Sequence, residues 1–290
     1  MTRIILNADD FGLAPGVNHS ILELNRAGAL SSATLMATAG HSAAAVEAAA
    51  SNSSLGIGCH IVFVDGTPAL SPASIPALAL HSGKFRPTLG AFVRDLLRGV
   101  ISDSEIEAEA IAQIRRLQSA GIRLTHLDTH KHTHAFPRVL RPLLRAALAC
   151  GIRAIRNPFE PDWALKATPS APLLRRMQVR LLRTQRREVL RLVQQAGLAT
   201  TDGAIGVLAT GTLDCATLQS LLGAMPSGTW ELVCHPGYLD DELTSANTRL
   251  RGSRPIEHAA LLEIVPAFLR NHPQVEMIHF GQRTTEGTAE

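Results

Sequence analysis

The sequence predicts an α/β protein built as one (β/α) barrel, complete or incomplete, with seven strands in a single domain that spans residues 1–290. Two observations predict this fold class. Short apolar runs of strand length alternate along the chain with longer segments of helical periodicity, a rhythm that is typical of a parallel sheet with helices packed outside it. The strand-like runs are also spread over nearly the whole chain, which favours a barrel over an open sheet.

Seven segments are expected to form strands, because each is a short run dominated by apolar and β-branched residues. In chain order these segments are residues 4–6, 33–36, 56–62, 124–128, 154–156, 230–235 and 275–280. The residues that end or directly follow such runs are candidates for the functional site, because the carboxyl ends of barrel strands carry the catalytic groups of this fold class.

Six segments are expected to form helices: residues 17–27, 41–50, 103–120, 137–149, 173–196 and 258–271. The third of them has Ile106, Ala110, Ile114 and Leu117 at helical spacing, with Ser102 before it as a plausible N-cap. Glycines at positions 121 and 151 follow helical segments and lead into strands, as a helix C-cap glycine does.

Two stretches interrupt the alternation. Residues 65–90 are rich in Pro, Ser and Gly and are expected to form a long loop over one mouth of the barrel, and residues 157–172 are expected to be irregular because of their prolines. Residues 283–290 are expected to form a disordered tail.

The first apolar run is too short for a signal peptide, and no uncharged apolar stretch reaches the roughly 20 residues that span a bilayer. We therefore expect a cytoplasmic protein.

The composition supports a substantial core and excludes a disordered chain, since 46% of the residues are hydrophobic and 18% are charged. The formal net charge of +3 gives no argument for nucleic acid as a partner. The four cysteines lie far apart in the chain and each adjoins an apolar run, so reduced and buried thiols are expected rather than disulfides.

The most informative segment is residues 126–134, which hold four imidazoles and a carboxylate. Alternate residues of an extended strand share a face, so a continuous strand here would align five of them on one side: His126, Asp128, His130, His132 and His134. A core strand would place apolar residues on that face, whereas neutral imidazole is the commonest side-chain metal ligand. The pattern predicts metal-assisted chemistry, in which some of these histidines are not ligands because a tetrahedral site has no room for all of them.

Candidate ligands also follow other predicted strands: Asp9 and Asp10 the first, His60 a later one and His235 a still later one. Adjacent buried carboxylates repel each other unless a cation lies beside them. Each residue has an alternative interpretation: the aspartates as a solvated turn, His60 as a hydrogen-bonded core residue, and His235 as a strand cap rather than a general acid. With His130, one carboxylate and two imidazoles suit a catalytic divalent ion that keeps an open position.

The remaining polar residues of this region are candidates for supporting roles. His132, His134 and Asp128 are expected to orient the ligands or to contact the substrate. Arg156 leaves the end of another predicted strand, where it either orients a catalytic aspartate by a charge-assisted hydrogen bond or is an exposed loop residue.

On these residues the chain resembles the YdjC/ChbG family of carbohydrate deacetylases. The matching pieces, in order over residues 3–283, are Asn7-Ala8-Asp9-Asp10-Phe11-Gly12, Gly58-Cys59-His60, residues 126–134 and Cys234-His235-Pro236. The resemblance implies a TIM-barrel-like fold and metal-dependent removal of an N-acetyl group from an amino sugar. By position it implies that Asp10, His60 and His130 hold one divalent ion, that Asp9 is the general base and that His235 is the general acid.

Within the family the chain is most similar to the HpnK-like branch associated with hopanoid biosynthesis, which implies an N-acetylglucosaminyl hopanoid as the substrate. The alternatives are a deacetylase of soluble chitooligosaccharides and a non-catalytic, metal-containing protein that binds a sugar or a lipid. The metal is left open between zinc, which two imidazoles favour, and magnesium, which is often assigned in this family. The oligomeric state is left open as well.

The basic segment 173–196 distinguishes the chain from the chitooligosaccharide branch. It carries seven arginines against the single acid Glu188, with leucines and valines between them. A basic amphipathic helix of this kind suits an anionic membrane surface, which would bring the enzyme to the inner membrane as a peripheral protein. The alternative is a solvated helix that packs its leucines on the barrel.

Overall fold

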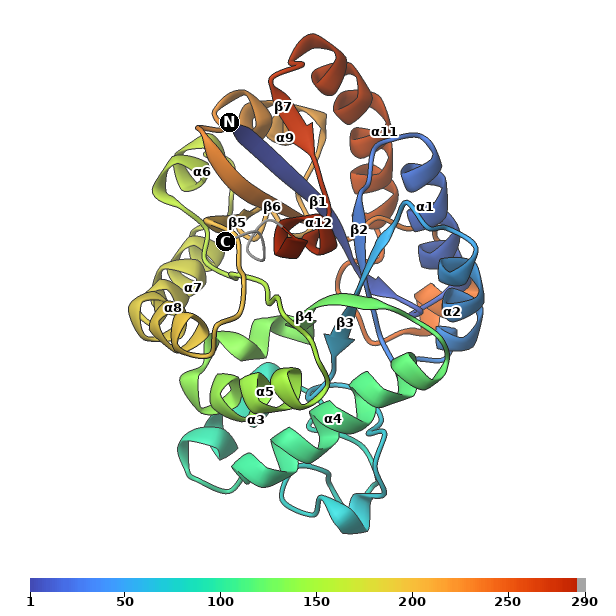
Figure 1. Ribbon diagram of the computed structural model, residues 1–290, viewed down its shortest axis with the longest axis vertical. Coiled ribbons are helices and arrows are strands. Elements are labelled where there is room, and N and C mark those ends of the chain that lie inside the picture. The colour runs from blue at the N-terminus through green and yellow to red at the C-terminus, as the bar shows by residue number, and fades with distance from the viewer. Residues whose placement is uncertain (286–290) are drawn as a thin grey trace.

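The central feature of the fold is one parallel sheet of seven strands, in the order β4-β3-β2-β1-β6-β5 with β7 paired to β1. The computed structural model describes residues 1–285. The strands are β1 Thr2–Phe11, β2 Ser32–Leu35, β3 Gly56–Ile61, β4 Leu124–Thr129, β5 Gly203–Ile205, β6 Gly228–Cys234 and β7 Val275–Met277. Figure 1 shows these strands at the centre of the molecule with helices arranged around them.

Strand β1 occupies the middle of the sheet and pairs with three other strands. Along one side it pairs with β6 over its first seven residues, and on the other side its start pairs with β7 and its end with β2. Its residues from Ile4 onward are buried, including the polar Asn7, Asp9 and Asp10. The two aspartates therefore lie at the carboxyl end of the central strand, between the ends of β2 and β6.

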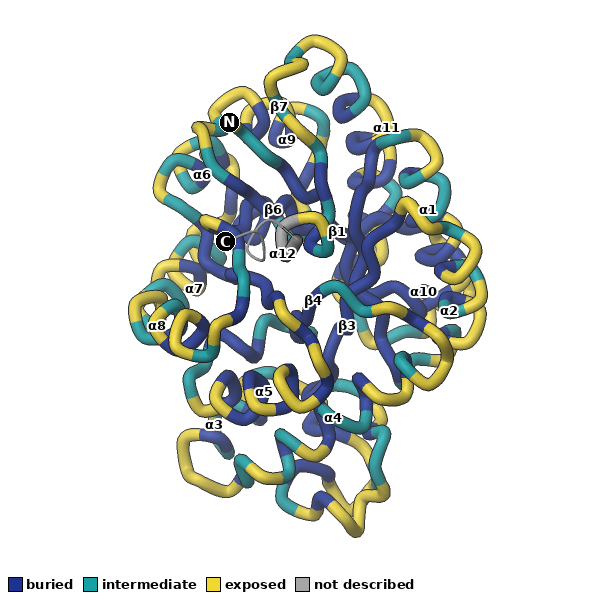
Figure 2. Tube along the Cα trace, viewed as in Figure 1, coloured by how far each residue is buried: buried dark blue, intermediate teal, exposed yellow. Residues whose placement is uncertain are grey.

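The helices cover the outside of the sheet. They are α1 Pro15–Arg26, α2 Ser42–Ala50, α3 Leu89–Leu97, α4 Asp103–Ser119, α5 Pro137–Ala149, α6 Asp162–Ala167, α7 Leu173–Arg183, α8 Arg186–Gln195, α9 Cys215–Gly223, α10 Asp241–Ser245, α11 Arg254–Asn271 and α12 Phe280–Thr285, with short 3₁₀ turns η1 Pro72–Ser74 and η2 His130–Ala135. The strands and the inner faces of these helices are buried, while the outer helical faces are exposed (Figure 2).

The prediction of a barrel is only partly right. The seven parallel strands in a single-domain α/β fold are confirmed, but the described residues form a curved, partial barrel and not a complete TIM barrel, because no regular strand joins β4 to β5. The predicted strand at 154–156 contributes only isolated bridges, Leu127 with Ile155 and Ala154 with Ala199. The prolines at positions 158 and 161 lack the N–H that a ladder needs, which ends the strand early.

Three other predictions need correction. The strand that begins at Leu124 ends at Thr129, so the histidines beyond it do not alternate along one strand face; they lie in η2, where Lys131 and His132 have left-handed backbones. The helix predicted over 173–196 is two helices, broken at residues 184–185. Helix α6 lies within the stretch 157–172 that was expected to be irregular.

The two helices of the basic segment differ in how far their apolar residues are buried. Helix α8 buries Val189, Leu192 and Val193, as a helix packed on the sheet should. Helix α7 buries only Val179 and leaves four large apolar side chains exposed: Leu173, Leu174, Met177 and Leu181. The interpretation as a packed helix therefore describes α8, whereas α7 keeps an exposed apolar face.

The remaining expectations concern the thiols and the chain end. All four cysteines are free, as expected; three are buried and Cys215 is partly exposed. The tail predicted at 283–290 enters helix α12 with its first three residues, and residues 286–290 lie outside the described part of the chain. None of the helices that the structure describes combines the length and the apolar character needed to cross a bilayer.

Candidate active site

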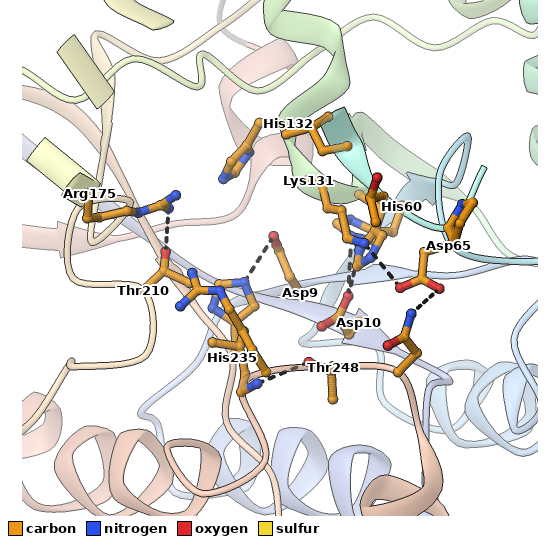
Figure 3. A pocket seen from close by; sticks show the side chains of 17 residues that line it. Asp9, Asp10, His60, Asp65, Lys131, His132, Arg175, Thr210, His235 and Thr248 are labelled. Carbon is orange, nitrogen blue, oxygen red and sulfur yellow. Dashed lines mark hydrogen bonds and ion pairs between the residues drawn. The ribbon is translucent and has the colours of Figure 1, made fainter. Parts of the chain in front are cut away.

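Side chains from strand ends far apart in the sequence converge on one cavity of about 450 Å³. Asp9, Asp10, His60, His130 and His235 all line it. Figure 3 shows Asp9, Asp10, His60 and His235 turned toward the same space. The convergence follows from the topology, since the carboxyl ends of parallel strands meet at one edge of the sheet. The pocket is therefore lined by the residues that the sequence predicts as metal ligands or proton-transfer groups.

The backbone around this pocket is strained. Four non-glycine residues within the described chain have a left-handed backbone, namely Asp10, Asp65, Lys131 and His132, with φ between 52° and 66°, and all four line the pocket. Such conformations cost of the order of 1–3 kcal/mol each and persist where the surroundings over-determine them. Ion pairs supply part of that restraint, since Lys131 Nζ lies 3.1 Å from Asp65 Oδ2.

Asp10, His60 and His130 form a compact triangle of potential ligand atoms. Asp10 Oδ1 lies 3.4 Å from His60 Nε2 and 3.2 Å from His130 Nδ1, and the two nitrogens are 3.3 Å apart. A tetrahedral ion bound at about 2.0–2.1 Å needs about 3.3–3.4 Å between its ligand atoms. An octahedral ion of the same bond length needs only about 2.9 Å between neighbouring ligands. The three residues therefore fit one divalent ion, and their spacing matches tetrahedral coordination better.

A second set of possible ligands, Asp9, His60 and Asp128, also lies within reach of one point. This set already has its cation, because the guanidinium of Arg156 contacts both carboxylates: Nη2 lies 2.7 Å from Asp9 Oδ1 and Nη1 lies 2.5 Å from Asp128 Oδ2. The set around Asp10 is therefore the better candidate for a metal ion.

His60 is held in the orientation that a metal ligand requires. Its Nδ1 donates to Asp128 Oδ1 at 2.8 Å, which the register of β3 and β4 explains because His60 and Asp128 are direct partners. The carboxylate fixes the orientation of the ring, with Nε2 facing Asp10. Burial lowers the pKa of His60, but Asp128, Asp10 and Asp9 outweigh it and raise the pKa to about 10. The site thus favours a positive charge at this imidazole.

Asp10 is held from its other side. Its Oδ2 accepts from Arg254 Nη2 at 2.5 Å, and the Arg254 side chain is fully buried at the start of α11. Burial raises the pKa of Asp10, whereas the charge of Arg254 and the hydrogen bonds of His130 and His60 lower it well below its ordinary value. Asp10 is therefore ionised, with Oδ1 presented to the two imidazoles.

Asp9 is held by Arg156, which is itself buried and also contacts Glu231 Oε1 at 2.7 Å. Both oxygens of Asp9 accept from Arg156, at 2.7 and 2.9 Å, which holds this carboxylate in one orientation. Burial raises the pKa of Asp9, but the charges of Arg156 and His60 prevail and hold that pKa well below its usual range. Asp9 stays ionised beside the triangle of Asp10, His60 and His130, which we call the ligand triangle.

His235 faces Asp9 from the end of β6. Its Nε2 lies 3.8 Å from Asp9 Oδ2, and its backbone N–H donates to Glu257 Oε2 at 2.6 Å. Burial lowers the pKa of His235 to about 4, because Arg254 and Arg156 add to that effect and Asp9 and Asp10 offset only part of it. The imidazole is therefore neutral at neutral pH, and its buried Nδ1 has no hydrogen-bond partner among the described residues.

The other clustered histidines have different environments. His132 lines the pocket, with its ring directed into it (Figure 3). His134 is fully buried, bonds through Nδ1 to Thr129 Oγ1 at 2.7 Å and is not among the residues that line the pocket. His126 is buried and stacks on Phe280 at 3.9 Å.

Sequence reasoning missed several residues of this site. Arg254, Glu231 and Glu257 contact Asp10, Arg156 and His235, respectively. Glu231 had a signal, since a carboxylate inside the apolar run of a predicted core strand needs a buried partner. Arg175 was noted only as part of a basic segment, yet it lines the pocket and bonds to Thr210 Oγ1 at 3.3 Å. No local pattern marks Arg254, because its partner lies 244 residues away.

The fold and the site together define an α/β protein whose parallel sheet presents an aspartate–histidine cluster, able to hold one metal ion, at the ends of its strands. The chain belongs to the YdjC-like protein family, whose model matches residues 3–267. The family predicted from the sequence motifs is confirmed.

Named relatives and solved structures extend this comparison. The chain is 27% identical over 263 residues to a carbohydrate deacetylase of Thermoanaerobacter pseudethanolicus, covering 91% of this chain and 92% of the relative. It is 32% identical over 245 residues to a carbohydrate deacetylase of Geobacillus stearothermophilus, covering 84% and 83%.

Two crystal structures share the fold. A protein of Enterococcus faecalis, named provisionally for cellobiose-phosphate cleavage, superposes with a TM-score of 0.77 at 22% identity, covering 97% of this chain and 98% of that chain. The lactam utilization protein of Thermus thermophilus superposes with a TM-score of 0.50 at 17% identity, covering 96% and 99%. At these identities the likeness concerns the fold alone.

Proposed function

We propose that the protein is a metal-dependent hydrolase that removes the N-acetyl group from an amino sugar. The observation that carries the proposal is the triangle of Asp10, His60 and His130, with Asp9 and His235 beside it in one pocket. Relatives that align with most of the chain are named carbohydrate deacetylases, which supports the reaction class.

In this proposal each residue has a defined part in an amide hydrolysis. The chemistry that a divalent ion supplies at Asp10, His60 and His130 is Lewis acidity, which polarises a carbonyl oxygen and lowers the pKa of a water molecule. Asp9 accepts the proton of the attacking water as the water oxygen bonds to the acetamide carbon. His235 delivers a proton to the amide nitrogen as the C–N bond breaks, because an amine leaves poorly without it. Acetate and a free amino sugar result.

The neutral state of His235 adds a condition to this scheme. With a pKa of about 4, the imidazole holds no spare proton before the reaction begins. Asp9 Oδ2 lies 3.8 Å from His235 Nε2, so the proton that Asp9 accepts has a short path to the imidazole. We therefore assign Asp9 and His235 as a pair that takes one proton from water and returns it to the leaving nitrogen.

The ligand spacing also bears on which ion is used. Edges of 3.2 to 3.4 Å match a tetrahedral ion, and two imidazoles with one carboxylate suit a late transition ion. We propose zinc or a similar ion over magnesium, which prefers oxygen ligands in octahedral geometry. Metal analysis of protein purified without chelators tests this: one equivalent of zinc is expected, and a preference for magnesium would refute it.

For the natural substrate we propose a lipid-linked amino sugar, such as an N-acetylglucosaminyl hopanoid, over a soluble chitooligosaccharide. The supporting observation is the exposed apolar face of α7, where Leu173, Leu174 and Met177 are each at least 60% exposed beside several arginines. Apolar side chains flanked by arginines suit the surface of an anionic membrane, which would place the enzyme peripherally at the inner membrane.

Vesicle binding tests the membrane contact separately from catalysis. Replacing Leu173, Leu174 and Met177 together by aspartate is expected to abolish co-sedimentation with anionic phospholipid vesicles. Ile256→Asp, an equally drastic change at a 54% exposed residue of α11, is the matched control and is expected to leave it intact. Vesicle binding that survives the triple substitution would remove membrane contact from the proposal.

The deacetylase assay uses N-acetylglucosamine conjugates, with released acetate and bound metal measured on the same sample. We expect acetate release from the wild-type protein, and from Asp9→Asn a normal metal content without acetate. A non-catalytic sugar- or lipid-binding protein would release no acetate in either case. That outcome, with one ion bound per chain, would refute the enzymatic assignment.

A further inference from the structure

A second cavity, of about 640 Å³, adjoins the candidate active site and lies between helices α3 and α7. Four residues line both cavities: Leu89, Lys131, His132 and Arg175. The two cavities are therefore direct neighbours, and a molecule that reaches past these four side chains would occupy both. We call this second cavity the α3–α7 groove.

The walls of the groove are mainly apolar. Helix α3 contributes Val93, Leu96 and Leu97, and the facing helix α7 contributes Val179, Leu181 and Leu182. None of the described residues that line the groove is acidic. Gln178, Thr184 and Gln185 also line the groove, but apolar side chains make up most of its lining. A subsite for a further sugar unit would need mainly polar groups aimed at its hydroxyls, so this lining suits a hydrocarbon better.

The entrance of the groove is unusual for a protein surface. Leu97 and Leu181 lie on opposite walls and are 72% and 73% exposed. Leu181 also belongs to the exposed apolar face of α7, so that face continues into the groove. Exposed apolar side chains that border a cavity mark a binding site for an apolar partner.

The inner end of the groove is polar. Arg175 lies at the junction with the catalytic pocket, where its Nη2 donates to Val207 O at 2.8 Å. Its buried Nε has no hydrogen-bond partner within residues 1–285. In Figure 3, Arg175 and His132 lie to one side of Asp9, whereas His60 and Asp65 lie to the other side. The junction therefore offers hydrogen-bond donors between a polar pocket and an apolar groove.

We infer that the α3–α7 groove binds an apolar aglycone that the amino sugar carries, with Arg175 at the polar link between sugar and hydrocarbon. This inference rests on the proposed deacetylase function, because it places the sugar at the ligand triangle. In this inference the α3–α7 groove selects alkyl or polycyclic glycosides over free oligosaccharides.

Binding of short and long glycosides tests the groove. We compare methyl and octyl N-acetyl-β-glucosaminide with N,N′-diacetylchitobiose by calorimetry on the metal-loaded protein, with the octyl glycoside below its micellar concentration. Each methylene buried in the groove is expected to tighten binding about fourfold, so the octyl glycoside should bind at least about 100-fold more tightly than the methyl glycoside. Equal affinities, or a comparable gain with chitobiose instead, would overturn the inference.

Two substitutions on one helix locate the effect. Leu181→Asp puts a charge in the wall of the groove at an exposed position, where folding is not at risk, and is expected to reduce the octyl-over-methyl preference by about tenfold or more. Leu174→Asp makes the same change at a 68% exposed residue of α7 that does not line the groove, and should keep the preference. An equal loss in both variants would refute the groove as the site.

The same samples separate this inference from the proposed function. If the octyl glycoside binds tightly but no acetate is released, the deacetylase assignment fails and the groove remains. If acetate is released from methyl and octyl glycosides with equal kcat/KM and equal affinity, the groove inference fails and the enzyme remains.

Discussion

Replacing Asp128 by asparagine tests how the site prepares His60 for a metal ion. Asp128 Oδ1 accepts from His60 Nδ1 at 2.8 Å, and Oδ2 contacts Arg156 Nη1, both in a fully buried position. The neutral amide weakens the hold on the imidazole tautomer and removes one of the charges that favour a cation at His60. Losses of such supporting carboxylates typically cost about 10- to 100-fold in metal affinity, or about 1.4–2.7 kcal/mol.

The assay is a competitive zinc titration against a chromophoric chelator, with circular dichroism to confirm that each variant is folded. Asp65→Asn is the matched control, since it removes the same charge from a residue of the same pocket that pairs with Lys131 rather than with a ligand. We expect the zinc affinity of Asp128→Asn to fall at least about tenfold below that of Asp65→Asn. Equal affinities in the two variants would refute the supporting role of Asp128.

Three further predictions concern single residues. Asp9→Asn should lower kcat for acetate release by at least about 100-fold with zinc affinity within a few-fold of wild type, whereas a parallel loss of zinc would make Asp9 a ligand. His235→Gln should lower kcat far more than it changes KM, and unchanged kcat would exclude it as the proton donor. Burial raises the pKa of Glu160 from its ordinary 4.5 to about 7, although the N–H groups of residues 206 and 208 partly oppose this. Its folded pKa is thus above its unfolded one, so stability is lost as pH rises from about 4.5 to 7. Chemical denaturation at about pH 5 and about pH 8 measures how much the free energy of unfolding falls between these pH values. In Glu160→Gln this fall should be smaller than in the wild type by up to about 3 kcal/mol, and an equal fall in both proteins would disprove the effect.

Much of the fold could be predicted because the core strands and helices can be identified from the composition and spacing of their apolar residues. The runs around Ile57, Leu232 and Ile114 are apolar at the spacing of strands or helices, and they form β3, β6 and α4. Strand β5 could not be predicted, because Gly203–Ile205 has too few residues to show any alternation. The extent of β1 was also hidden, since its buried Asn7, Asp9 and Asp10 resemble a polar turn until their distant partners are known.

The candidate site was predictable where it depends on strand ends and not where it depends on long-range charge pairing. Asp10, His60 and His130 each follow or end a recognisable strand, so parallel topology brings them together. The turn after β4 was not foreseeable, because the left-handed backbones of Lys131 and His132 are conformations that these residue types rarely adopt. That turn brings His130 to the triangle and directs His132 into the pocket, which an extended strand would not do.

The most direct test of the central claim is a crystal structure of the protein grown with zinc, with anomalous diffraction recorded on both sides of the zinc absorption edge. We predict a single strong anomalous peak within bonding distance of Asp10 Oδ1, His60 Nε2 and His130 Nδ1. A peak elsewhere, or none at this triangle in a protein that is folded and saturated with zinc, would contradict the account.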